Sequence, residues 1–127
     1  MLLYIVESAV PLLVGLLVWA IVVAYRKDGG KHRKVAMMHA IATWLSTVIV
    51  VTLVRAGFRM GEHAPAWIQD LHWNIIMWIP PLLLMLALSG LSRKKNIHLP
   101  IAAIYVVVWL AALTTGGMMF SMHKGWL

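Results

Sequence analysis

Four apolar stretches, each long enough to cross a membrane and each bounded by charge, constrain this chain more than any other feature. They cover residues 3–25, 35–54, 73–91 and 99–122. A helix needs roughly 20 mainly apolar residues to cross the hydrocarbon core of a bilayer. A water-soluble domain of 127 residues could not bury these stretches, because 62% of the chain is hydrophobic and only 12% is charged. The sequence therefore predicts an all-α integral membrane protein, with four transmembrane helices in a single membrane domain over residues 1–127.

The loops between the apolar stretches are short, which predicts an antiparallel, up-down four-helix bundle. Basic residues are distributed unevenly between the two sides of such a bundle. Eight lie in the first and third loops: Arg26, Lys27, Lys31, Arg33, Lys34, Arg93, Lys94 and Lys95. Three lie on the other side: Arg55, Arg59 and Lys124. Since cytoplasmic loops carry the excess of Lys and Arg, we expect an inner-membrane protein with both termini on the outer, periplasmic side.

The net charge of +7 comes from short basic runs between apolar stretches. That placement indicates contact with anionic lipid headgroups rather than nucleic acid, so the expected partners are the bilayer and other membrane subunits. The chain has no cysteine, which excludes disulfides and thiolate metal sites. No internal repeat is evident. No Ser/His/Asp set, phosphate-binding glycine loop or carboxylate pair points to an enzyme of its own.

The third apolar stretch contains Pro80 and Pro81 near its middle. Each proline lacks a backbone donor, so carbonyls around Ile76 and Met77 lose their partners and the helix should kink. In the fourth stretch, residues 114–117 are small and would let another backbone approach closely. Both features are explained by packing geometry, although a kink can also make room for a cofactor.

His39 is the histidine placed furthest inside an expected helix. It shares one helical stripe with Thr43, Ser46 and Thr47, and polar stripes of membrane helices face the bundle interior. Ionisable residues at membrane depth are expensive and usually functional. His39 is therefore a candidate haem ligand; the alternative is a hydrogen bond to a neighbouring helix.

A haem b iron held by two side chains needs them on different helices at similar depth. The inner candidates are His39 with His98 or Met85, and the outer candidates are His72 with His123. Two histidine layers at opposite membrane faces would suit a two-haem electron conduit. Boundary histidines also arise from amphipathicity alone.

Copper is the second candidate cofactor. Soft thioethers combined with imidazole select Cu(I), and both kinds of ligand gather near the outer end of the fourth helix. The candidate metal ligands are Met118, Met119, Met122 and His123 on that helix, His63 and Met60 in the facing loop, and His32 on the inner side. Methionine is also a routine gap-filler in apolar helices, which is the competing explanation.

Glu7 lies close to the outer membrane boundary, where an unpaired carboxylate is costly. Arg55, His72 and water are its available partners. An ion pair between Glu7 and Arg55 is the alternative that a double mutant can test.

The order of several motifs resembles a known family. Lys31-His32-Arg33-Lys34 with Met37 opens the second helix, His72 opens the third, and Leu99-Pro100 with Tyr105 follow the third loop. In this order the chain resembles small four-helix bacterial membrane proteins linked to cytochrome oxidase maturation, the CtaM-like family, over roughly residues 16 to 122.

The resemblance implies that His32 and His72 are functional positions. Family members usually carry a His-Arg pair about nine residues before the proline of helix four. The loop here reads Ser92-Arg93-Lys94-Lys95, and its one histidine is His98 beside Pro100. A fourth family histidine is therefore not carried over.

These observations favour an accessory or maturation protein of a respiratory, haem-copper oxidase type complex, whose histidines contact haem or copper. Two alternatives remain open from the sequence. One is a b-type cytochrome subunit that passes electrons to or from quinone. The other is a purely structural small subunit whose histidines are only hydrogen-bonded.

Overall fold

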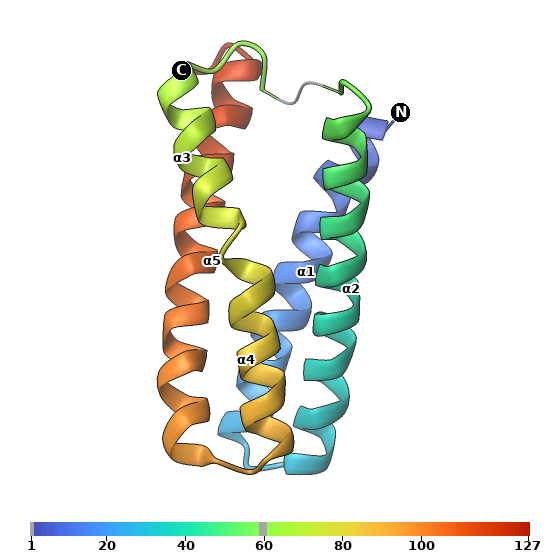
Figure 1. The fold of residues 1–127 in the computed structure, drawn as a ribbon, viewed down its shortest axis with the longest axis vertical. Coiled ribbons are helices and arrows are strands. Elements are labelled where there is room, and N and C mark those ends of the chain that lie inside the picture. The colour runs from blue at the N-terminus through green and yellow to red at the C-terminus, as the bar shows by residue number, and fades with distance from the viewer. Residues whose placement is uncertain (1, 59–60) are drawn as a thin grey trace. The chain divides into compact units, whose positions relative to one another are not determined.

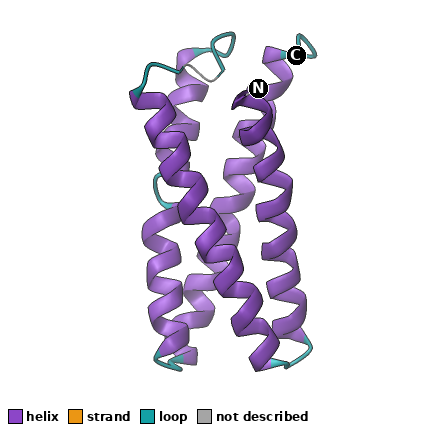
Figure 2. Ribbon diagram, turned by 90° about the vertical axis from the view of Figure 1, so that its right-hand side faces the viewer, coloured by secondary structure: helices purple, strands orange, loops and turns teal. Residues whose placement is uncertain are grey.

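The computed structural model describes the backbone of residues 2–58 and 61–127 and the side chains of residues 8–58 and 61–127. Throughout these ranges all regular structure is α-helix, as Figure 2 shows. The stretches long and apolar enough to cross a membrane are Ser8–Tyr25, Gly29–Arg55, Ala66–Leu91 and Lys95–His123. The predicted all-α fold is confirmed, and so are four helical stretches long and apolar enough to cross a membrane. The chain divides into two compact units, Met1–Phe58 and Arg59–Leu127.

The first unit is a hairpin of α1 (Leu2–Tyr25) and α2 (Gly29–Arg55), which lie side by side in Figure 1. In the turn between them, Lys27 has a φ of 61°, and the carboxylate of Asp28 accepts a 3.0 Å hydrogen bond from the backbone N–H of Lys31. This side-chain cap satisfies an N–H at the helix start. Because of it, α2 begins six residues before the apolar stretch at 35 and takes the basic run 31–34 into its first turns.

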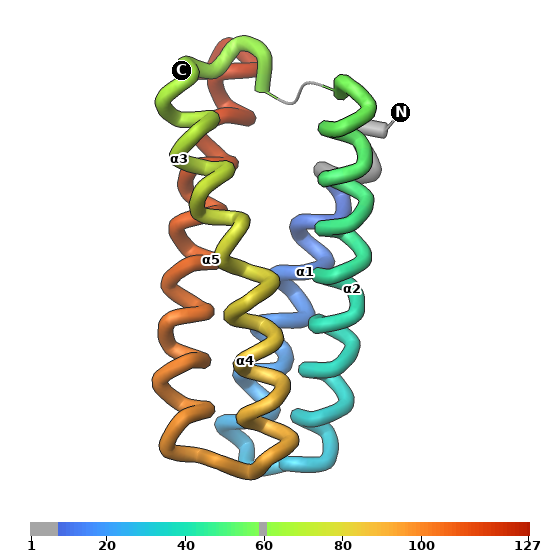
Figure 3. Tube along the Cα trace, viewed as in Figure 1, coloured from blue at the N-terminus to red at the C-terminus, as the bar shows by residue number. Residues whose placement is uncertain are grey.

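The second unit contains α3 (Ala66–Ile76), α4 (Ile79–Leu91) and α5 (Lys95–His123), and α5 packs along both of the others. The predicted kink is confirmed and is a complete break between α3 and α4, visible in Figure 3. Pro80 and Pro81 fall in the first turn of α4, where a missing N–H costs no helical bond. The α3 helix begins seven residues before the expected 73. The prediction was late because the first turns of α3 include polar residues, which lower the local hydropathy.

The turns of the two units have the same conformation, 66 residues apart. Lys27 and Arg93 have left-handed φ angles of 61° and 53°, and the helix caps that follow, Asp28 and Lys94, have φ/ψ of −86°/83° and −85°/78°. The backbone bonds correspond as well. They are Arg26 N–H to Val22 O and Ser92 N–H to Leu88 O, Lys27 N–H to Ala24 O and Arg93 N–H to Gly90 O, and Asp28 N–H to Val23 O and Lys94 N–H to Ser89 O.

The buried stripes repeat with the same spacing. In α2 the buried residues are Val35, His39 and Thr43; in α5 the corresponding residues are Ile101, Tyr105 and Trp109, also buried. The two hairpins therefore share the geometry of the turn and the spacing of the buried stripe that follows it. This similarity is not visible in the sequence, because few of the paired residues are identical: His39 corresponds to Tyr105 and Thr43 to Trp109.

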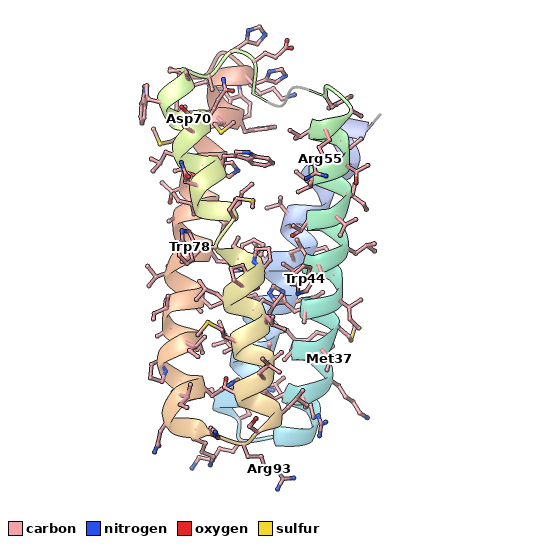
Figure 4. The ribbon with its side chains drawn as sticks, viewed as in Figure 1. Met37, Trp44, Arg55, Asp70, Trp78 and Arg93 are labelled. Carbon is pink, nitrogen blue, oxygen red and sulfur yellow. The ribbon has the colours of Figure 1, made fainter. Side chains whose placement is uncertain are left out.

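Large apolar side chains are exposed along the helices of both units. Trp44 and Met37 project from α2, and Trp78 from the α3–α4 break, as Figure 4 shows; their exposed fractions are 43%, 43% and 63%. Exposed apolar side chains are compatible with lipid contact, since placing them in hydrocarbon has no desolvation cost.

Candidate functional site

His39 lies on α2 within a stretch long and apolar enough to cross a membrane, and it is 3% exposed. Its Nδ1–H donates to the carbonyl oxygen of Leu13 on α1 at 3.1 Å. The hydroxyl of Thr43, one turn along α2, lies 3.5 Å from its Nε2. The carbonyl partner assigns the proton to Nδ1 and makes Nε2 the nitrogen with the lone pair.

His32 and His98 form the same interhelical bond in the two units. The Nδ1–H of His32 donates to the carbonyl of Ala20 at 2.8 Å, and that of His98 to the carbonyl of Leu86 at 3.2 Å. Donor and acceptor are 12 residues apart in both cases. These bonds tie each second helix to the one before it.

The ring of His98 has a second acceptor and a close neighbour. Ser89 Oγ lies 3.1 Å from its Nδ1, and a methyl group added to Gly90 would lie 3.1 Å from its Cε1. Gly90 therefore provides the space in which the ring reaches the backbone of α4.

His72 on α3 has a similar arrangement against α5. Its Nδ1–H donates to Thr115 Oγ1 at 2.8 Å, while the Thr115 hydroxyl donates to the carbonyl of Ala111 at 2.9 Å. A methyl group added to Gly116 would lie 3.0 Å from His72 Cε1. The small residues expected to admit a close neighbour thus admit an imidazole ring.

These histidines share one chemical consequence. Each Nδ1 faces an oxygen acceptor, so Nε2 is the nitrogen able to bind a metal. Ligating histidines in proteins have this arrangement, with the other ring nitrogen bonded to a carbonyl or hydroxyl that fixes the ring orientation.

A loop of the second unit brings His63 to His123. The ring centroids are 5.4 Å apart with an interplanar angle of 21°. One turn earlier on α5, Met119 lies under the loop: its Cε would be 2.6 Å from a methyl group added to Gly61. Met118 and Met122 are half-buried on the same last turns of α5.

The predicted haem-ligand pairs are His72 with His123, and His39 with His98 or Met85. His72 bonds Thr115, eight residues before His123, which corresponds to about 12 Å along the helix axis. The structure therefore places His123 beside His63 rather than beside His72. The pairing of His39 with His98 or Met85 would join the two units and stays a prediction.

Two predicted features fall outside the described part of the chain. The Glu7 side chain and Met60 are not among the described residues, so the Glu7–Arg55 pair and a Met60 ligand stay predictions. Arg55 is exposed at the last turn of α2 and is labelled in Figure 4. Among the side chains of residues 8–58 and 61–127, no three His, Asp or Glu come together to hold a metal ion.

The partners of the histidines could not be predicted from the sequence. Gly90 and Gly116 each make room for an imidazole, and Leu13, Ala20 and Leu86 contribute only backbone carbonyls, which no side-chain pattern can indicate. Comparisons of this chain with protein-family models, curated proteins and solved structures found no match.

Proposed function

We propose that this protein is a small accessory or maturation factor of a respiratory, haem-copper oxidase type membrane complex, and that His39 is an axial haem ligand. The observation that carries the proposal is a difference between the two units. His32 and His98 recur at equivalent places, so the hairpin itself accounts for them. His39 has Tyr105 as its counterpart, so the hairpin does not require a histidine there.

The chemistry of His39 fits haem better than a chelated ion. Haem supplies four nitrogen ligands itself and takes only one or two side chains, whereas a protein-bound metal ion needs about three or four. His39 lies at membrane depth, and its Nδ1–H bond to Leu13 fixes the tautomer that ligation requires. When bound, haem would supply one-electron chemistry, and the protein would supply the orientation of the ligating nitrogen.

The test is a reduced-minus-oxidised difference spectrum of protein extracted in mild detergent. The wild type should give a b-type signal that His39→Phe abolishes, while helical circular dichroism stays unchanged. The matched control is His63→Ala, in an exposed loop, which should leave the spectrum intact. A wild type without haem, or a full spectrum in His39→Phe, would refute the proposal.

Thr43 separates ligation from a purely structural role of His39. Its hydroxyl lies 3.5 Å from Nε2 and would compete with an iron for that nitrogen. If His39 binds haem, Thr43→Val should keep or raise haem occupancy. If His39 serves only to contact Thr43, the same change should lower the free energy of unfolding, and neither the wild type nor the variant should show a haem signal.

A structural small subunit is the second candidate, favoured by the histidine–carbonyl bonds repeated in both units. It predicts that the protein carries no haem and that His32→Phe or His98→Phe dissociates it from a larger complex. Native electrophoresis of membranes from cells with each variant would test this.

The basic loops support a further part of the proposal, that both termini are periplasmic in an inner membrane. A periplasm-dependent reporter fused after Leu127 should be active, and one inserted in residues 26–34 should be silent. The reverse pattern would contradict the orientation.

A further inference from the structure

We propose that the loop preceding α3 and the last turn of α5 form a Cu(I) site whose ligands are His63, His123 and the thioether of Met119. The site lies wholly within the second unit. It does not rest on the haem proposal, which concerns His39 of the first unit.

The two imidazoles are already close enough to share one ion. A metal bound to one nitrogen of each ring at about 2 Å would lie roughly 3 Å from each centroid. The observed centroid separation of 5.4 Å is within that reach, and because the rings are stacked at 21°, each must rotate to direct an in-plane nitrogen at the ion. Both side chains are exposed, so small rotations that direct a nitrogen toward the ion cost little.

Met119 is positioned to supply the third ligand. It precedes His123 by four residues on α5, and side chains at that spacing are neighbours on one helix face. Its Cε lies under Gly61, two residues before His63, so the loop that carries His63 lies against Met119. Two imidazoles with a thioether make a donor set that selects Cu(I) over the harder divalent ions.

The loop is built to hold this position. Gly61 has a φ of 75°, a left-handed conformation that favours glycine, and Ala64 is buried. The Gln69 side-chain amide donates to the carbonyls of Gly61 and Ala64 at 3.0 and 2.6 Å. A surface pair of histidines without a role would not need a loop fixed at both ends of the turn that carries His63.

The experiment is an anaerobic competition between full-length protein in detergent and a chromogenic Cu(I) chelator. We expect one Cu(I) per chain in the wild type, and at least a tenfold loss of affinity in each of His63→Phe, His123→Phe and Met119→Leu. The control is Met77→Leu, an exposed methionine between α3 and α4 and outside the loop, which should bind as the wild type does.

Gly61→Ala tests the role of the loop without removing a ligand. The added methyl group would meet Met119 Cε at 2.6 Å, and the backbone would be strained at a φ of 75°. Cu(I) affinity should therefore fall, while circular dichroism and any haem spectrum stay unchanged. X-ray absorption of the wild-type complex should contain sulfur as well as nitrogen scatterers.

Several results would overturn the site. They are stoichiometry well below one, affinity that is unchanged in Met119→Leu, a copper shell without sulfur, and Zn(II) displacing Cu(I) at equal concentration. Loss of haem in His39→Phe with Cu(I) binding retained would show that the two sites are independent, so that failure of one proposal leaves the other unaffected.

Discussion

Substitution of Gly116 should distinguish packing around His72 from general helix stability. Replacing a helix-interior glycine with alanine stabilises a helix by about 0.5–1 kcal/mol, because alanine loses less backbone entropy on folding. At Gly116 the new methyl group would lie 3.0 Å from His72 Cε1 and must displace the ring. Displacing it weakens the 2.8 Å bond to Thr115, which is worth about 0.5–1.5 kcal/mol.

The matched control is Gly117→Ala, one residue along α5, where an added methyl group meets no atom within 4 Å among the described residues. That variant should gain the full helix-propensity term. The propensity term is common to both variants, so their free energies of unfolding should differ by the weakened bond, about 0.5–1.5 kcal/mol, with Gly116→Ala the less stable. Reversible unfolding in mixed detergent micelles, followed by circular dichroism, measures this difference.

A double-mutant cycle tests whether the effect of Gly116→Ala depends on the imidazole ring of His72. In a His72→Ala background the methyl group at position 116 has no imidazole to displace, so Gly116→Ala and Gly117→Ala should become equally stabilising. Equal stabilisation in the wild-type background would refute the assignment of Gly116 as the space for His72. A difference that persists without the imidazole would do the same.

Two further predictions concern the repeated turns. His32→Phe and His98→Phe should each lower the free energy of unfolding by about 0.6–1.7 kcal/mol, the range for interhelical bonds in membranes, and by similar amounts. Exposed His123→Phe should change it by less than about 0.5 kcal/mol. Asp28→Ala should cost about 1 kcal/mol through loss of the cap, whereas Lys94→Asp should gain up to about 1 kcal/mol by supplying a cap at the equivalent position. Micelle unfolding of each variant tests both, and a loss in Lys94→Asp would contradict the equivalence of the turns.

The helices could be predicted from the sequence because membrane-crossing length is a local property of composition. The break before Pro80 was predictable for the same reason, since a missing N–H acts on the same helix. Helix starts were less predictable. The first turns of α2 are basic and those of α3 are polar, so hydropathy places both boundaries too late, and the cap at Asp28 decides where α2 begins.

The histidine contacts could be predicted only in part. The polar stripe predicted that His39 faces the interior, and the clustered methionines indicated a candidate metal site at the end of α5. Both predictions follow from side-chain type, which the sequence gives directly. The acceptors are backbone carbonyls of Leu13, Ala20 and Leu86, which every residue type supplies equally. The sequence placed His63 in the loop facing His123, and their rings stack, whereas the pairing of His123 with His72 rested on helix depth alone.

The repeated turn gives a reason to treat the histidines differently from one another. A bond that recurs 66 residues later with the same donor atom, the same acceptor type and the same 12-residue spacing follows from the hairpin. At the His39 position the corresponding residue is Tyr105, an aromatic side chain buried to 1% exposure. A hairpin can thus fill that place with a larger, uncharged group, and burying a histidine there has a desolvation cost that only a specific partner offsets. The position where the two units differ, rather than the position where they agree, is therefore where chemistry should be sought first.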